Sequence, residues 1–154
     1  MDIKIVELNS IYALVIPKSN DDIAKKNKKG CLNDLKEDAF VELGKIVPAE
    51  KVKYKTGASL EPTATLYEFG FGFDDETFIQ SLPKIPEGIF KRIYERGIWV
   101  VLSLKDHHDM QEGWKFIMDW TIKNGYAPNF ERGDPYELYK SGEEVEIRMP
   151  IKKA

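Results

Sequence analysis

Two long stretches of this chain carry the same residue pattern 87 positions apart. Residues 3–16 are rich in Ile and Val and are interrupted by the polar pair Asn9-Ser10, and residues 89–104 are interrupted just before Gly97. Runs of β-branched and aromatic residues bounded by turn residues are typical of strands. We therefore expect each stretch to form extended chain with one bend. At this offset Ile11-Tyr12 meets Ile98-Trp99 and Leu14-Val15 meets Val101-Leu102.

An amphipathic helix is predicted after each of these stretches. Residues 33–47 place Leu35, Ala39 and Leu43 on one helical stripe, with Asn33 as the cap and Pro48 as the stop. The second helix is predicted to begin at Asp109, with Glu112 in the capping-box position, and to end at Asn124-Gly125.

Three further strands are indicated. Residues 63–73 alternate strictly, which gives this strand one aromatic face. That face holds Thr65, Tyr67, Phe69, Phe71 and Phe73, and the other holds Ala64, Leu66, Glu68, Gly70 and Gly72. Residues 136–139 and 145–151 form the last two strands, joined by a turn at Ser141-Gly142.

The order of these elements predicts an α+β fold in a single domain spanning residues 1–154. Its two pseudo-symmetric strand–helix–strand–strand modules, about 1–84 and 85–154, would together form antiparallel sheet with two main helices. The triplet Tyr67-Glu68-Phe69 has a counterpart in Tyr136-Glu137-Leu138. Because duplicated halves commonly leave a cleft where they meet, we expect a central ligand groove.

Composition excludes several classes of function. The chain has 18 aromatic residues but one cysteine, Cys31, and two histidines, so it can form neither an internal disulfide nor a Cys/His zinc site. A reducing, cytoplasmic location is the expectation. The net charge of −3 argues against direct nucleic-acid binding and favours cationic or neutral partners. Neither a signal peptide nor an apolar stretch long enough for a bilayer is present, so we expect no membrane association.

Other candidate motifs favour ordinary structural roles. The basic cluster Lys25, Lys26, Lys28 and Lys29 is interleaved with polar residues, which is typical of a solvated loop. His107-His108-Asp109 would form a turn before the second helix, because adjacent residues in extended chain point apart and no third ligand lies at helical spacing. We therefore expect no metal ion and no cofactor. Cys31 has no identifiable partner base.

Glu137 is the sharpest candidate for a binding residue. It shares a strand face with Tyr139, and a carboxylate among rings gains most by meeting a cation whose apolar body stacks on them. The alternative is an edge-strand glutamate that faces water. The second helix is apolar around about two-thirds of its circumference, so Trp114 and Trp120 either fill a core or line a cavity.

The C-terminal third carries a recognisable pattern. It runs from Trp120 through Lys123-Asn124-Gly125-Tyr126 to Tyr136-Glu137-Leu138-Tyr139 and closes with Glu146-Ile147-Arg148-Met149-Pro150-Ile151-Lys152. With Gly97-Ile98-Trp99 before it, this pattern resembles the GyrI-like family, the effector-binding domain of many bacterial transcription activators, which also occurs as free-standing proteins. The resemblance covers nearly the whole chain. Pro17-Lys18-Ser19-Asn20 departs from the family's usual arginine and glycine after the first strand.

The resemblance implies two strand–helix–strand–strand modules with a ligand groove between them. It carries the acidic residue of the family's Glu-x-Tyr motif onto Glu137, with Tyr139 beside it. Family members build their aromatic walls from strands and the second helix, which makes Tyr67, Trp99, Trp114 and Trp120 the candidate wall residues.

The leading functional hypothesis is non-catalytic binding of hydrophobic, cationic small molecules, for sensing or sequestration. Since no helix-turn-helix precedes residue 3, any role in transcription would act through a partner. One alternative is a hydrolase of reactive cyclopropane-containing compounds, which some GyrI-like proteins are, with Glu137 and Glu68 as catalytic carboxylates. The other is a protein-binding module like the family's namesake, which inhibits DNA gyrase.

Overall fold

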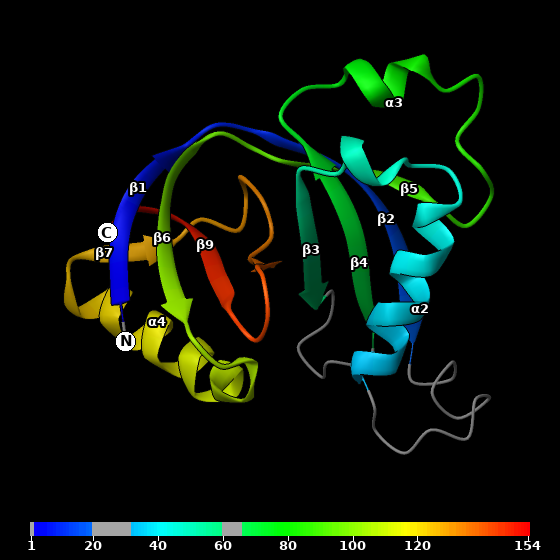
Figure 1. Ribbon diagram of the computed structural model, residues 1–154. Helices are drawn as coiled ribbons and strands as arrows, with labels where there is room; N and C mark the ends of the chain where they lie inside the picture. The colour runs from blue at the N-terminus through cyan, green and yellow to red at the C-terminus, as the bar shows by residue number, and fades with distance from the viewer. Residues whose placement is uncertain (1, 20–31, 60–65) are drawn as a thin grey trace. The chain divides into compact units, whose positions relative to one another are not determined.

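A computed structural model describes residues 2–19, 32–59 and 66–154 (Figure 1). The basic cluster of Lys25 to Lys29, Cys31, the side chain of Asn33 and the first residues of the predicted strand 63–73 lie outside the described part. The chain divides into two compact units, one spanning Ile11–Ile93 and the other combining Met1–Ser10 with Tyr94–Ala154. The fold is α+β, with antiparallel strand pairing and two main helices.

The unit Ile11–Ile93 consists of strands and one long helix, α2 (Leu32–Gly44). Its strands lie in the order β3-β4-β2-β5, with β4 antiparallel to both β2 and β3. They are β2 (Ile11–Ser19), β3 (Tyr54–Ser59), β4 (Leu66–Phe73) and β5 (Phe90–Tyr94), the last ending in the other unit. The described part of this unit also contains two short helices, η1 (Ala49–Lys51) and α3 (Thr77–Ser81).

The unit with both termini is built around helix α4 (Met110–Lys123). Its strands lie in the order β1-β6-β9-β8, and a short β7 pairs with β9. They are β1 (Asp2–Leu8), β6 (Gly97–Leu104), β7 (Tyr126–Pro128), β8 (Tyr136–Tyr139) and β9 (Val145–Lys153). A single-turn helix, η2 (His107–Asp109), leads into α4.

The two units repeat one topology. In each unit, one strand comes from the segment that precedes the other unit in the sequence. β1 precedes β2 in the sequence but pairs with β6, whereas β5 precedes β6 but lies beside β2. The strand orders β5-β2-β4-β3 and β1-β6-β9-β8 then correspond, with α2 matching α4. The predicted pseudo-symmetric strand–helix–strand–strand order is confirmed.

The aromatic face predicted for β4 is the face that packs on α2. Phe40 of α2 stacks on Phe71 at a centroid distance of 5.3 Å and meets Phe69 edge-on at 6.3 Å. On β2, Leu14 pairs with Phe71 and Ile16 with Phe69, so both share this face. Aromatic area of this kind supplies most of the burial that holds a helix on a small sheet.

In the other unit, α4 packs on one face of β6 and β9. Gly113 of α4 lies so close to these strands that a Cβ there would be 3.0 Å from side-chain atoms of Leu104 and Ile147. Ile117, one turn further on, is fully buried in the same cluster. Strand residues of the cluster alternate, as the pleat requires. They are Val100, Leu102, Leu104, Val145, Ile147, Met149 and Ile151.

The offset of 87 residues is wrong by one position for the strand faces. It aligns Leu14, which faces α2, with Val101, whose neighbour Leu102 faces α4. A slip of one residue moves every side chain of a strand to the other face. Equivalent strand residues on equivalent faces must therefore be separated by an even number of residues. The similarity of the two segments in turn residues, aromatic residues and apolar residues could not show this.

Both ends of α4 lie where they were predicted, with Asp109 as the N-cap residue, but the predicted side-chain cap at the N-terminus is absent. Gly125 has φ +84° after the last helical residue, as a C-cap glycine requires. Asp109 makes no side-chain cap. Instead Asp106 caps η2 by accepting a hydrogen bond of 2.9 Å from the backbone N–H of His108. No helix in the described part of the chain is long and apolar enough to cross a membrane.

Candidate functional site

Glu137 lies between β8 and α4. It pairs with Ile147 of β9, a residue of the α4-facing cluster, and is 5% exposed. Its Oε2 accepts a hydrogen bond of 2.7 Å from the hydroxyl of Tyr139, and its Oε1 accepts one of 3.4 Å from the indole Nε1–H of Trp114. The edge-strand alternative, a glutamate facing water, is therefore wrong.

Trp114 and Tyr139 are the rings that the structure brings to Glu137. Both are half-buried and pack against the apolar cluster under α4. Trp120, one and a half turns further along α4, packs against the same cluster. Three of the predicted site residues, Glu137, Tyr139 and Trp114, thus form one contacting group, because strand phase and helix phase both aim them into the same layer.

Trp99 faces the other side of the sheet, away from α4. It is 1% exposed, and its indole N–H donates to the backbone carbonyl of Glu95 at 3.0 Å. Its ring meets Tyr136 edge-on at 5.4 Å, and the guanidinium of Arg132 lies 5.3 Å from its centroid. Within its unit, Trp99 belongs to a packed aromatic group separate from the group of Glu137.

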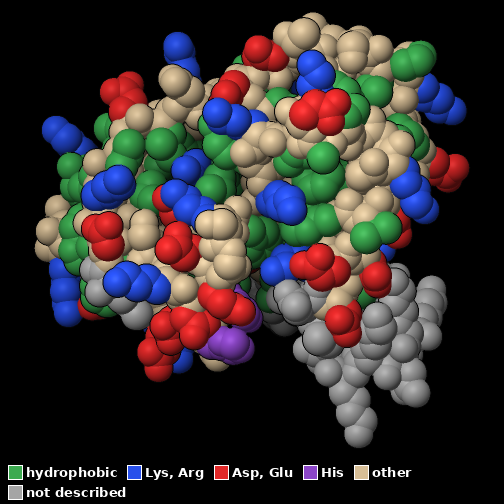
Figure 2. Space-filling model, in the orientation of Figure 1, with side chains coloured by type: hydrophobic (Ala, Val, Ile, Leu, Met, Phe, Trp, Pro, Cys, Tyr) green, Lys and Arg blue, Asp and Glu red, His purple; other side chains and the backbone are tan. Residues whose placement is uncertain are grey.

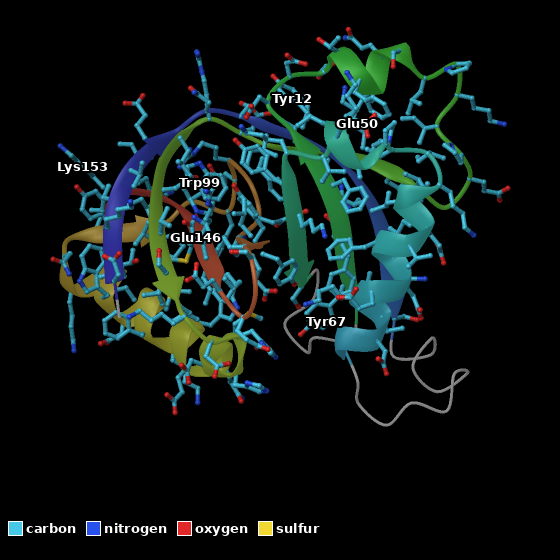
Figure 3. The ribbon with its side chains drawn as sticks, in the orientation of Figure 1. Tyr12, Glu50, Tyr67, Trp99, Glu146 and Lys153 are labelled. Carbon is cyan, nitrogen blue, oxygen red and sulfur yellow. The ribbon has the colours of Figure 1, made fainter. Side chains whose placement is uncertain are left out.

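In the unit Ile11–Ile93, Tyr67 and Glu68 lie on opposite faces of β4. Tyr67 stacks on Phe69 at 6.2 Å, on the face that carries α2 (Figure 3). Glu68 is 3% exposed, and both its oxygens accept from Nε of Arg92, at 2.9 and 3.0 Å.

The prediction that Glu68 occupies the repeat-related position of Glu137 is wrong. β4 corresponds to β9, whereas β8, which carries Glu137, corresponds to β3. In addition, Glu68 points away from the helix of its unit and Glu137 points toward α4. The Tyr-Glu dipeptide occurs in both strands, but the order of strands in the sheet, and not a short sequence match, decides which strands are equivalent.

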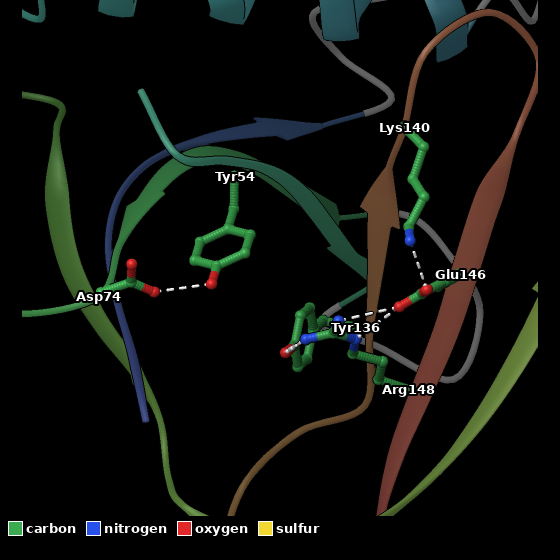
Figure 4. Close-up of polar contacts among 6 residues, drawn as sticks. All are labelled: Tyr54, Asp74, Tyr136, Lys140, Glu146 and Arg148. Carbon is green, nitrogen blue, oxygen red and sulfur yellow. Dashed lines mark hydrogen bonds and ion pairs between the residues drawn. The ribbon is translucent and has the colours of Figure 1, made fainter. Parts of the chain in front are cut away.

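A cluster of buried polar side chains on β8 and β9 was not predicted from the sequence. On the face away from α4, Arg148 donates to the hydroxyl of Tyr136 at 2.9 Å and to Oε1 of Glu146 at 2.8 Å (Figure 4). Lys140 contacts the other oxygen of Glu146 at 2.7 Å. The signal was present in the sequence, since Glu146 and Arg148 stand two apart in the otherwise apolar stretch 145–151 and must share a face of the strand.

These contacts set the protonation of the group. Burial by itself raises the pKa of Glu146, but the hydrogen bonds from Lys140 and Arg148 outweigh it and leave the pKa below its ordinary value of 4.5. Burial raises the pKa of Tyr136. Glu146 is therefore an ionised carboxylate whose charge is already balanced by two cations.

Each unit also has a surface cavity, and Glu137 lines neither of the two. One, of about 440 Å³, lies at the ends of β6 and β9 and includes Ser103, Lys140 and Glu146 in its lining. The other, of about 550 Å³, lies in the unit Ile11–Ile93 and includes Lys53, Asp74 and Phe78. Charged side chains make up half of the lining of the larger cavity and most of the lining of the smaller one.

One cluster has the residue types of a metal site. Asp106, His107, His108 and Glu143 each place a ligand atom within 4.8 Å of the others. The expectation of adjacent histidines pointing apart rested on extended chain, but η2 is helical and its two imidazole rings lie 4.1 Å apart. Glu143 comes from the turn between β8 and β9, 35 residues beyond His108, and helical spacing could not have shown it.

Comparison with known proteins finds likeness in solved structures. No family model matches the chain, and no curated protein matches its sequence. The crystal structure of the EcmrR C-terminal domain superposes with a TM-score of 0.69 at 15% identity, covering 99% of this chain and 98% of that domain. The chain spans 58% of the EcmrR chain solved in complex with DNA.

Two other solved structures share the fold. SAV2435 bound to tetraphenylphosphonium superposes with a TM-score of 0.59 at 12% identity, covering 99% of this chain and 94% of that one. A hydrolase from Listeria innocua superposes with a TM-score of 0.58 at 11% identity, covering 97% of this chain and 91% of that one. The chain therefore has the fold of the EcmrR C-terminal domain and of GyrI-like proteins, as the sequence resemblance predicted.

Proposed function

We propose that this chain binds hydrophobic, cationic small molecules, and that the carboxylate of Glu137 meets the positive charge of the ligand. The observation that carries the proposal is the environment of Glu137, which is 5% exposed with the neutral donors Tyr139 and Trp114 on its two oxygens. A carboxylate removed from water is costly, and a cation placed beside it recovers much of that cost. The adjacent ring faces attract the same cation.

The hydrogen bonds that Tyr139 and Trp114 donate to Glu137 differ in strength. The bond from Tyr139 is short at 2.7 Å, whereas the bond from Trp114 is long at 3.4 Å. Trp114 is therefore the partner that an incoming cation would displace, and its indole would then pack against the apolar body of the ligand. Binding should change the fluorescence of Trp114 directly.

The likeness in fold supports this ligand class. SAV2435, which was solved with tetraphenylphosphonium, is similar to this chain along nearly its whole length, and tetraphenylphosphonium is a hydrophobic cation. The EcmrR C-terminal domain is similar over the same length, and EcmrR was solved with DNA. We infer an effector-sensing role in transcription regulation.

The test is a titration with tetraphenylphosphonium followed by tryptophan fluorescence. Glu137→Gln should weaken binding at least tenfold, which corresponds to about 1.4 kcal/mol. Glu146→Gln is the matched control, because Glu146 is also buried, contacts Arg148 and Lys140, and faces away from α4. Tetraphenylborate, of the same shape and opposite charge, should bind more weakly than the cation. Equal affinity of wild type and Glu137→Gln for the cation would overturn the proposal.

A hydrolase is the second candidate, and the similarity to the Listeria innocua hydrolase favours it. A carboxylate in apolar surroundings is suited to general acid or base catalysis on water. Glu68 is a poor second carboxylate, since Arg92 already contacts both of its oxygens. Turnover of a reactive cyclopropane-containing substrate that Glu137→Ala abolishes would establish this activity, and stoichiometric binding without product would exclude it.

A further inference from the structure

We propose that Asp106, His107, His108 and Glu143 form a binding site for one divalent transition-metal ion, with Zn²⁺ as the best match. These residues lie outside the Glu137 group and outside the proposed function. The ligand atoms of all four lie within 4.8 Å of one another. Figure 2 shows histidine side chains directly beside Asp and Glu side chains on the surface.

Direct contacts already join these side chains in pairs. Nδ1 of His108 lies 2.7 Å from Oδ1 of Asp106, and Nδ1 of His107 contacts the carboxylate of Glu143. The two imidazole rings lie 4.1 Å apart, tilted by 33°. One ligand atom from each of the four side chains therefore already lies in one small region.

Backbone hydrogen bonds fix both segments that supply the ligands. Asp106 accepts from the N–H of His108 through its side chain at 2.9 Å and from the N–H of Asp109 through its carbonyl at 3.1 Å. In the turn that carries Glu143, the N–H of Lys140 donates to the carbonyl of Glu144 at 3.0 Å, and Gly142 has φ +69°. The ligands are thus placed by structure that does not depend on the ion.

The donor set selects the kind of metal. Zn²⁺ binds histidine nitrogen and carboxylate oxygen at roughly 2.0–2.2 Å in a tetrahedron, so its ligand atoms lie about 3.4 Å apart. All four side chains are at least partly exposed, so rotations about their side-chain bonds can bring the four ligand atoms to this spacing. Mg²⁺ and Ca²⁺ prefer six or more oxygen ligands and match this set poorly.

A bound ion would link the start of α4 to the turn between β8 and β9. The ligands on the α4 side lie 35 to 37 residues before Glu143 in the sequence. An ion that binds the folded chain and not the unfolded one raises stability in proportion to the logarithm of its concentration over its dissociation constant. Zinc should therefore raise the melting temperature of the protein.

The experiment is a Zn²⁺ titration of the untagged full chain by calorimetry, after treatment with a chelator and in a Cys31→Ser background that removes the only thiol. Wild type should bind one ion per chain, and Glu143→Gln should weaken binding at least about tenfold. Glu144→Gln, the neighbouring carboxylate outside the group, is the matched control and should bind like wild type. Mg²⁺ should not compete.

A second measurement separates the site from weak surface binding. Zinc should raise the melting temperature of wild type and of Glu144→Gln, but not that of His107→Ala/His108→Ala, which has no histidine left. This comparison needs only variants that are folded without metal, which their own unfolding transitions report. The same weak Zn²⁺ affinity in wild type, Glu143→Gln and the double variant would overturn the proposal.

Discussion

The hydroxyl of Tyr139 donates a hydrogen bond of 2.7 Å to Oε2 of Glu137, two residues earlier on β8. A bond from a neutral donor to a carboxylate contributes roughly 1.5–3 kcal/mol. Tyr139→Phe should therefore lower the free energy of unfolding by about 2 kcal/mol, as measured by urea denaturation. Tyr126→Phe is the control, because Tyr126 packs against the same cluster. An equal loss of unfolding free energy in both variants would show that the hydrogen bond to Glu137 does not contribute the expected stability.

Removing only one partner of the ion pair between Glu68 and Arg92 should lower the free energy of unfolding. Breaking a buried pair costs roughly 3–5 kcal/mol, and since Arg92 is 45% exposed we expect about 2 kcal/mol for Arg92→Met. The cost comes from the buried carboxylate left without its cation. Adding Glu68→Gln to Arg92→Met should restore most of the loss in a double-mutant cycle, and additive losses would contradict the explanation.

Gly70 is required by close packing between β4 and its two neighbouring strands. A Cβ there would lie 2.7 Å from Cγ1 of Val15 and 2.9 Å from the backbone oxygen of Leu14. Because backbone cannot move as a side-chain tip can, Gly70→Ala should destabilise the protein by about 1–3 kcal/mol. Gly44→Ala at the end of α2, with open space around it, should be neutral or stabilising. Thermal unfolding of both variants gives the comparison.

Acid should weaken the contacts of Glu146. The pKa of Glu146 is lowered in the folded protein, so its stabilisation is fully present above the ordinary value of 4.5 and is lost as pH falls through the lowered value. Glu146→Gln should be less stable than wild type at pH 7 and should lose less stability below pH 4.5. Glu144→Gln keeps the ion pairs of Glu146 and should follow the wild-type profile. Parallel pH profiles for wild type and Glu146→Gln would contradict the prediction.

Much of the fold could be predicted from local pattern. The alternation of residues 66–73 identified a strand with one aromatic face, and that face packs on α2. The sequence also predicted the bend at Asn9-Ser10, the turn at Ser141-Gly142 and the C-cap at Gly125. These features depend on backbone preferences and on periodicity, which neighbouring residues determine.

The candidate site was only partly predictable. Glu137, Tyr139 and Trp114 come together because a strand phase and a helix phase are both local properties. Trp99 was assigned to the same wall, but it packs with Tyr136 on the opposite face. A sequence rich in aromatic residues predicts that these residues will be buried. It does not predict on which face of the sheet each of them packs.

By itself, then, the sequence determined the two long helices, the order of most strands, the aromatic face of β4 and the placement of Glu137 beside Tyr139, but it did not show β3 or α3. Tertiary structure alone decided that β1 pairs with β6, that Glu68 is matched to Arg92 and that Glu143 reaches His107. The physical reason is distance along the chain. Local preferences act over a few residues, whereas strand pairing brings together groups separated by dozens, and only their mutual packing selects which ones meet.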